Sequence, residues 1–181
     1  LWIGLNTIHL TASYDEAFAA EYDAVLFVMQ GYETAPVLFE MVGRSVQPPT
    51  IVSLQRGIGN TERIASVYGA DRVIQGALTV TLDQPLVNGK PALETVALHP
   101  SGGIGLADDH PLSRDLAAFL TSAGLSVILD NGRDLQWSAL FWQLYGNAIP
   151  ALVDLPFEDV RGSPALFRLE YRQLLEALGI I

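Results

Sequence analysis

The sequence of 181 residues carries 20 acidic and 10 basic residues, for a formal net charge of -10, and half of its residues are hydrophobic. Because nucleic-acid backbones are bound by clustered Lys and Arg, this acidic balance argues against a nucleic-acid partner. The chain has no cysteine and no apolar run as long as a membrane helix, which excludes disulfides, thiolate metal sites and a membrane span and favours a cytoplasmic location.

The first part of the chain alternates between strand and helix signals. Residues 23–30, DAVLFVMQ, and residues 50–55, TIVSLQ, are apolar runs of the kind found in strands buried on both faces of a parallel sheet. A helix is predicted after each strand, over residues 32–42 and 60–69. In the second helix Asn60 is suited to cap the start and Gly69 the end.

Further strands are predicted in the middle of the chain. A third strand is expected over residues 72–82, and the turn Asn88-Gly89-Lys90-Pro91 predicts an antiparallel hairpin with residues 93–99. Residues 103–106 suit another short strand. An amphipathic helix over 112–123 and a strand over 125–130 follow.

The last part of the chain has helical periodicity. One helix is predicted over residues 134–149, and a final helix begins at Ser163-Pro164, where an N-cap residue precedes proline at the first helical position. The pattern therefore predicts an α/β layer with a mostly parallel sheet over residues 1–130, followed by an all-helical segment over residues 131–181.

Three positions on the helix predicted over 134–149 are spaced four residues apart, and this spacing directs their side chains to one side. A ligand on that side would meet Ala139, Gln143 and Asn147 together. The alternative is that both amides are partly buried and hydrogen-bonded to neighbouring backbone.

Two turns that follow strands are further candidates. The stretch LQRGIGN, residues 54–60, joins a strand end to a helix start, where open α/β sheets bind ligands and where free N–H groups attract anions. The stretch VMQGY, residues 28–32, has a similar position. The alternative for both is an ordinary connecting turn. The three histidines lack metal-ligand spacing, so no metal site is predicted.

From Tyr22 to Ile181 the order of these pieces resembles the ketopantoate reductase (2-dehydropantoate 2-reductase) family. The matching stretches are DAVLFVMQGY, LQRGIGNTE, GADRVIQG, the segment around His99 to Leu106, and Trp137 to Asn147. The last of these falls on the family signature W-x-K-L-x-x-N-x-x-x-N. The combination in this order is specific, whereas each stretch alone is not.

The resemblance implies a fold, a reaction and site residues. Residues 1–130 would be a partial Rossmann-like NADP-binding domain without the first glycine-rich βα unit, and residues 131–181 the start of a helical substrate and dimerisation domain. The implied reaction is NADPH-dependent reduction of a small 2-keto acid such as 2-dehydropantoate, by a homodimer. The implied residues are Gln30, Arg56 and Gly57 for the cofactor, and Gln143 and Asn147 for catalysis.

The sequence departs from the family pattern at four positions. Ala139 stands where the family has its catalytic lysine, Gln143 and Arg56 each replace an asparagine, and Gln30 replaces a lysine. The one lysine of the sequence, Lys90, falls in the predicted hairpin turn. The alternative is therefore a family member that has lost catalysis and acts as a binding or dimerisation protein. Because the family's glycine-rich turn would precede Leu1, we also expect the sequence to be a fragment.

Overall fold

A computed structural model describes residues 11–79, 82–83, 86–87, 90–91, 97–98 and 102–179. The chain divides into two compact units, Leu1–Gln136 and Trp137–Ile181. The helix α5 (Gly132–Leu144) begins in the first unit and ends in the second. Within the described residues, no helix is long and apolar enough to cross a membrane.

A five-stranded sheet forms the centre of the first unit. Its order is β1-β2-β3-β8-β9, and the strands are β1 (Ala24–Phe27), β2 (Thr50–Ser53), β3 (Val73–Leu78), β8 (Ile104–Ala107) and β9 (Val127–Asp130). The pairs β1-β2, β2-β3 and β8-β9 are parallel, and β3-β8 is antiparallel. The predicted α/β class with a mostly parallel sheet is thus confirmed.

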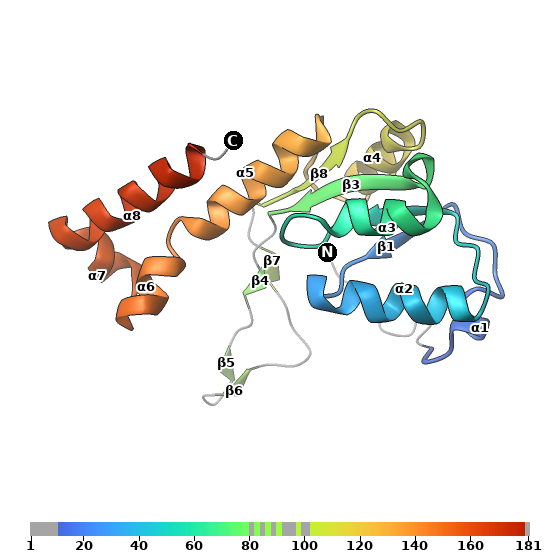
Figure 1. The fold of residues 1–181 in the computed structure, drawn as a ribbon, viewed down its shortest axis with the longest axis horizontal. Coiled ribbons are helices and arrows are strands. Elements are labelled where there is room, and N and C mark those ends of the chain that lie inside the picture. Colours follow the sequence, from blue (N-terminus) through green and yellow to red (C-terminus); the bar gives the residue numbers. More distant parts are fainter. Residues whose placement is uncertain are drawn as a thin grey trace. The chain divides into compact units, whose positions relative to one another are not determined.

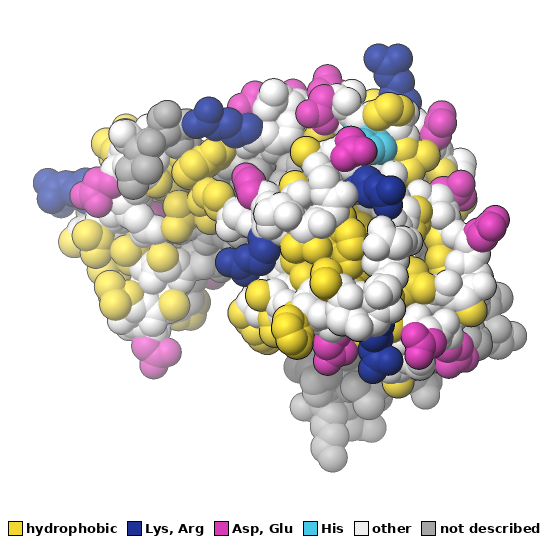
Figure 2. Space-filling view, turned by 45° about the vertical axis from the view of Figure 1, so that its right-hand side comes forward, with side chains coloured by type: hydrophobic (Ala, Val, Ile, Leu, Met, Phe, Trp, Pro, Cys, Tyr) yellow, Lys and Arg dark blue, Asp and Glu magenta, His cyan; other side chains and the backbone are white. Residues whose placement is uncertain are grey.

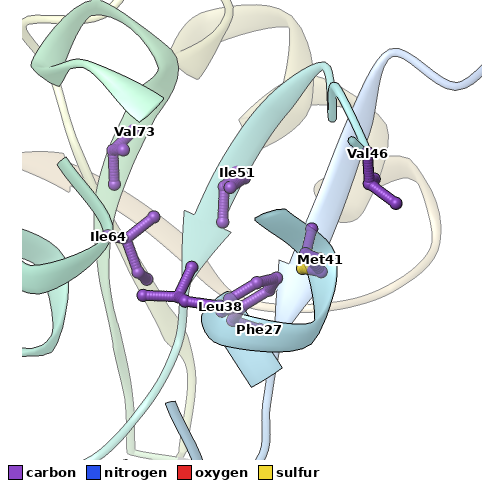
Figure 3. Close-up of a cluster of buried hydrophobic side chains, with 7 residues drawn as sticks. All are labelled: Phe27, Leu38, Met41, Val46, Ile51, Ile64 and Val73. Carbon is purple, nitrogen blue, oxygen red and sulfur yellow. The ribbon is translucent and has the colours of Figure 1, made fainter. Parts of the chain in front are cut away.

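Helices cover both faces of this sheet (Figure 1). The helices of this unit, besides the start of α5, are α1 (Tyr14–Ala17), α2 (Thr34–Gly43), α3 (Asn60–Tyr68) and α4 (Ser113–Ser122), with the short 3-10 turns η2 (Gly31–Glu33) and η3 (Ala70–Arg72). One buried cluster joins α2 and α3 to the sheet, as Figure 3 shows for Leu38, Ile51 and Ile64. A second cluster contains Val52 and Ile74 and packs against α4. Because successive strand residues point to opposite faces, the continuous apolar runs fill both clusters.

Two short antiparallel strand pairs lie between β3 and β8 in the sequence. Strand β4 (Leu82–Asp83) pairs with β7 (Ala97–Leu98), and β5 (Leu86–Val87) pairs with β6 (Lys90–Pro91), both antiparallel. This pairing confirms the predicted antiparallel hairpin. Lys90 and Pro91, predicted to belong to its turn, instead form β6, and the other turn residues, Asn88 and Gly89, lie outside the described residues. The predicted third strand ends earlier than expected, at Leu78.

Helices make up the described part of the second unit. After the end of α5 come α6 (Ala148–Val153), α7 (Phe157–Gly162) and α8 (Pro164–Leu178). The start of α8 at Ser163-Pro164 is as predicted, with Ser163 as N-cap. The prediction of one helix over residues 134–149 is wrong, because α5 ends at Leu144 and α6 begins at Ala148.

Gly146 causes this break between α5 and α6. It has a left-handed backbone, with φ of 80°, and a Cβ atom built on it would lie 3.2 Å from the ring of Phe157. The same ring meets Tyr145 edge-on, with ring centroids 5.2 Å apart. A left-handed residue ends an α-helix, and glycine adopts this conformation without steric cost.

Candidate functional site in the first unit and polar contacts in the second

The carboxyl ends of β1 and β2 carry the three residues predicted to bind a cofactor. Because the two strands are parallel, the turns that follow them leave the sheet at the same edge. Gln30 lies in the turn after β1, and Arg56 and Gly57 lie in the loop after β2; all three are exposed. The structure therefore brings these predicted residues to one edge of the sheet.

Two hydrogen bonds between Gln30 and Glu33 hold the turn after β1. The Gln30 N–H donates a hydrogen bond to Glu33 Oε2 at 3.0 Å, and the Glu33 N–H donates to the Gln30 carbonyl at 2.9 Å. These two contacts close the turn at the start of η2 and leave the end of the Gln30 side chain at the surface.

The loop after β2 contains two left-handed glycines, Gly57 and Gly59, with φ of 95° and 89°. Gly59 immediately precedes α3, and the expectation that Asn60 caps this helix is wrong. Asn60 is instead the first helical residue, and its Nδ2 donates to the Arg56 carbonyl oxygen at 3.0 Å. The amide therefore folds the loop back on itself instead of capping the helix.

The start of α5 makes a contact with this loop that sequence reasoning missed. The buried amide of Gln136 donates from Nε2 to the Gly57 carbonyl oxygen at 3.3 Å. Gly132, at the first turn of the same helix, packs closely against Gln75 and Ala107; a Cβ atom there would lie 3.1 Å from the Cβ of each. The sequence holds no signal for this contact, because 79 positions separate Gln136 from Gly57.

Two hollows open at the opposite edge of the sheet. They flank the segments that precede β1, β2 and β3, measure about 360 and 660 Å³, and share Arg72 in their lining. Tyr68 lines the smaller one, its hydroxyl is buried without a partner among the described residues, and burial raises the pKa of this phenol. Neither hollow contains a predicted site residue, so both are separate from the candidate site.

The second unit contains the three remaining predicted positions. Ala139 and Gln143 lie on α5 and are partly buried, whereas Asn147 lies beyond the helix break and is exposed. Asn147 Nδ2 donates to the Gln143 carbonyl oxygen at 2.8 Å. The expectation that all three share one side of one helix is therefore corrected, because Asn147 precedes α6 with a non-helical backbone.

Glu170 on α8 is a buried polar residue that sequence reasoning missed. Its side chain is fully buried, and Oε1 accepts a hydrogen bond from the Gly146 N–H at 2.6 Å. Its second oxygen, and Oε1 of Gln173 one turn later, have no partner among the described residues. A signal was present, because Glu170 occupies the helical face of Leu166, Leu174 and Ala177. The carboxylate stabilises the break at Gly146.

The described part of the chain contains no set of metal ligands. No group of three or more His, Asp or Glu side chains there is placed to hold a metal ion. His9 and His99 lie outside the described residues. Both ring nitrogens of His110 contact backbone groups. Its Nε2 lies 3.0 Å from the Asp71 carbonyl oxygen, and its Nδ1 accepts a hydrogen bond from the Leu112 N–H at 3.1 Å.

Known proteins similar to this chain are oxidoreductases. No family model matches the sequence. The chain is 27% identical over 148 residues to 2-dehydropantoate 2-reductase of Halobacterium salinarum. The aligned region covers 78% of this chain and 46% of the relative. A solved ketopantoate reductase from Ralstonia eutropha JMP134 has a TM-score of 0.71 at 22% identity and covers 87% of this chain and 51% of that one.

A structure of D-mandelate dehydrogenase in complex with NADH has a TM-score of 0.67 at 16% identity and covers 83% of this chain and 49% of that one. The chain thus spans about half the length of the relatives that it matches. The resemblance to ketopantoate reductases is confirmed in sequence by the Halobacterium relative and in fold by the solved structures.

Proposed function

We propose that this chain is part of an NADPH-dependent reductase of 2-keto acids of the ketopantoate reductase type. In this proposal residues 1–130 form most of the nicotinamide-binding domain, and residues 131–181 the start of the helical substrate domain. One observation carries the proposal: the turns that bear Gln30, Arg56 and Gly57 pack together at the carboxyl edge of parallel strands. Open α/β sheets bind ligands at this edge.

The residues at this edge suit an anionic dinucleotide. The left-handed Gly57 presents backbone without a side chain, which permits close approach of a ligand. The exposed Arg56 guanidinium supplies positive charge and several N–H donors, and the exposed Gln30 amide supplies both a donor and an acceptor. A bound nicotinamide would supply the hydride that reduces the keto carbon.

The helical unit supplies polar groups for the substrate in this proposal. Asn147 uses one of its amide hydrogens on the Gln143 carbonyl, which leaves the second hydrogen and the amide oxygen for a keto acid. Ala139 offers no donor to the keto oxygen. Turnover would therefore lack the charge stabilisation that the family's lysine provides.

Titration of the purified protein with NADPH tests the proposal through nucleotide fluorescence. We expect saturable binding, weakened about 10-fold by Arg56→Ala, because one charge-assisted hydrogen bond contributes roughly 1.5 to 3 kcal/mol. The matched control is Arg114→Ala, which removes an exposed arginine from α4 and is expected to leave the affinity unchanged. Absence of saturable NADPH binding by the wild-type protein contradicts the proposal.

We further propose that the protein forms a homodimer through α8. This helix exposes an apolar row at helical spacing, formed by Phe167, Tyr171, Leu175 and Leu178, and Figure 2 shows hydrophobic side chains exposed on the molecular surface. Such rows mark interaction surfaces when they are contiguous. Light scattering on the eluting protein should give twice the chain mass, and Tyr171→Glu should return it to the single-chain value. A monomeric wild-type protein contradicts this assembly.

A further inference from the structure

Gln55 is a buried amide just beyond the end of β2, and its side chain forms hydrogen bonds to three residues near the same edge of the sheet. Its side chain is 5% exposed. Nε2 lies 2.7 Å from Thr34 Oγ1 and 3.2 Å from the Met29 carbonyl oxygen, and Oε1 accepts from Ser53 Oγ at 3.4 Å. Both amide hydrogens and the amide oxygen therefore have partners.

These contacts connect the loop after β2 to both ends of the turn after β1. Met29 lies just beyond the end of β1, and Thr34 is the fully buried first residue of α2. The turn between them carries Gln30. One side chain therefore holds the beginning and the end of this turn at a set distance from β2.

A second contact packs the middle of the same turn against the same loop. A Cβ atom built on Gly31 would lie 3.0 Å from Asn60 Oδ1 and 3.1 Å from Asn60 Nδ2, so the backbone of Gly31 rests on the Asn60 amide. Asn60 in turn holds the Arg56 carbonyl. The turn after β1 and the loop after β2 therefore form one block, with Gln55 buried inside it.

We propose that Gln55 is a positioning residue for cofactor binding, which keeps Gln30 on one turn in register with Arg56 and Gly57 on the other. The inference rests on the proposed function, since the block matters for chemistry only if a nicotinamide cofactor binds there. Gln55 itself is buried beneath the turns and acts through them. An amide in this place suits the task because it donates twice from one nitrogen, which a hydroxyl or an apolar side chain cannot do.

Gln55→Met tests the inference, because methionine has nearly the same length and makes no such hydrogen bonds. The matched control is Gln47→Met, the same change at an exposed position before β2 on the opposite sheet edge. Val73→Ala is a second control, which removes core packing at the start of β3 and leaves both turns intact. Amide hydrogen exchange and NADPH affinity are measured on all the variants.

For Gln55→Met we expect about 10-fold weaker NADPH binding and about 10-fold faster exchange at residues 30–34 and 56–60, with exchange in β2 and β3 unchanged. Gln47→Met should match the wild type in both measurements. Thr34→Val removes only the hydroxyl that accepts from Gln55 and should change the same residues in the same direction. If Gln55→Met does not fold, Thr34→Val carries the test.

Two results overturn the inference. One is a Gln55→Met variant whose amide exchange at both turns and whose NADPH affinity are the same as those of Gln47→Met. The other is faster exchange spread over the whole sheet, as in Val73→Ala, which assigns Gln55 to general stability alone. If the wild-type protein binds no NADPH, the proposed function fails, and the exchange data alone decide whether Gln55 holds the two turns together.

Discussion

Replacing Ala139 with lysine is expected, on the proposed function, to raise the rate of NADPH-dependent reduction of 2-dehydropantoate by about 10²- to 10³-fold. The reason is electrostatic: negative charge develops on the keto oxygen as hydride arrives, and a preorganised ammonium group stabilises that charge. Removal of one such donor from an enzyme costs roughly 3 to 4 kcal/mol, and its return to a competent site should recover a similar amount. The measurement is the loss of NADPH absorbance with saturating keto acid.

The helix should accept this lysine. Lysine is a good helix former, and a long aliphatic stem lets the ammonium group reach solvent or substrate from a partly buried position such as 139. Ser138→Lys is the matched control, since it adds the same charge at the exposed neighbouring position, about 100° around the helix. Ala139→Met adds the length without the charge. Both controls should leave the rate unchanged, and an equal gain in either variant rejects the electrostatic explanation.

Replacing Ile64 with alanine is expected to lower the free energy of unfolding of the first unit by about 2 to 5 kcal/mol. Ile64 is fully buried on α3 and belongs to the cluster that joins α2 and α3 to the sheet, as Figure 3 shows for its neighbours Leu38 and Ile51. The loss combines the transfer of apolar surface with a cavity that the surrounding side chains only partly fill. Denaturant unfolding followed by circular dichroism measures the change.

Val67 provides the control for this prediction. It lies on the same helix, is exposed, and loses apolar surface without opening a cavity when changed to alanine. Val67→Ala is expected to change the unfolding free energy by about 0.5 kcal/mol or less. The same loss in both variants would mean that α3 is not held to the sheet through the buried cluster.

Local patterns were sufficient for the fold class. Continuous apolar runs such as DAVLFVMQ and TIVSLQ predict strands buried on both faces, and β1 and β2 lie within those runs. The expected burial is confirmed for β2 and is wrong for β1, because β1 is the edge strand of the sheet and its Leu26 is 44% exposed. The alternation of strands and helices then leads to parallel neighbours, and the pairings β1-β2 and β2-β3 confirm it. The matching motifs in their order indicated ketopantoate reductase, and the comparisons confirm that resemblance.

The candidate cofactor residues also follow from local reasoning. Gln30 and Arg56 come directly after strands that are parallel, so topology alone sends them to one edge of the sheet. The side chains that hold their turns do not follow from it. Gln55 contacts Met29 and Thr34, 26 and 21 positions away, and no period in the sequence marks such a contact.

The sequence by itself determined the strand runs, the start of α8, the acidic balance and the residue types at each family position, because each depends on side-chain chemistry or on a period of two to four residues. Only the tertiary structure decided where α5 ends. The helical period continues through Gly146, but the Phe157 ring and the Glu170 carboxylate, 11 and 24 positions later, select a left-handed backbone there. The hydrogen bond from the Gly146 N–H to Glu170 exists only once α8 has packed against this segment, so the local helical period cannot predict it.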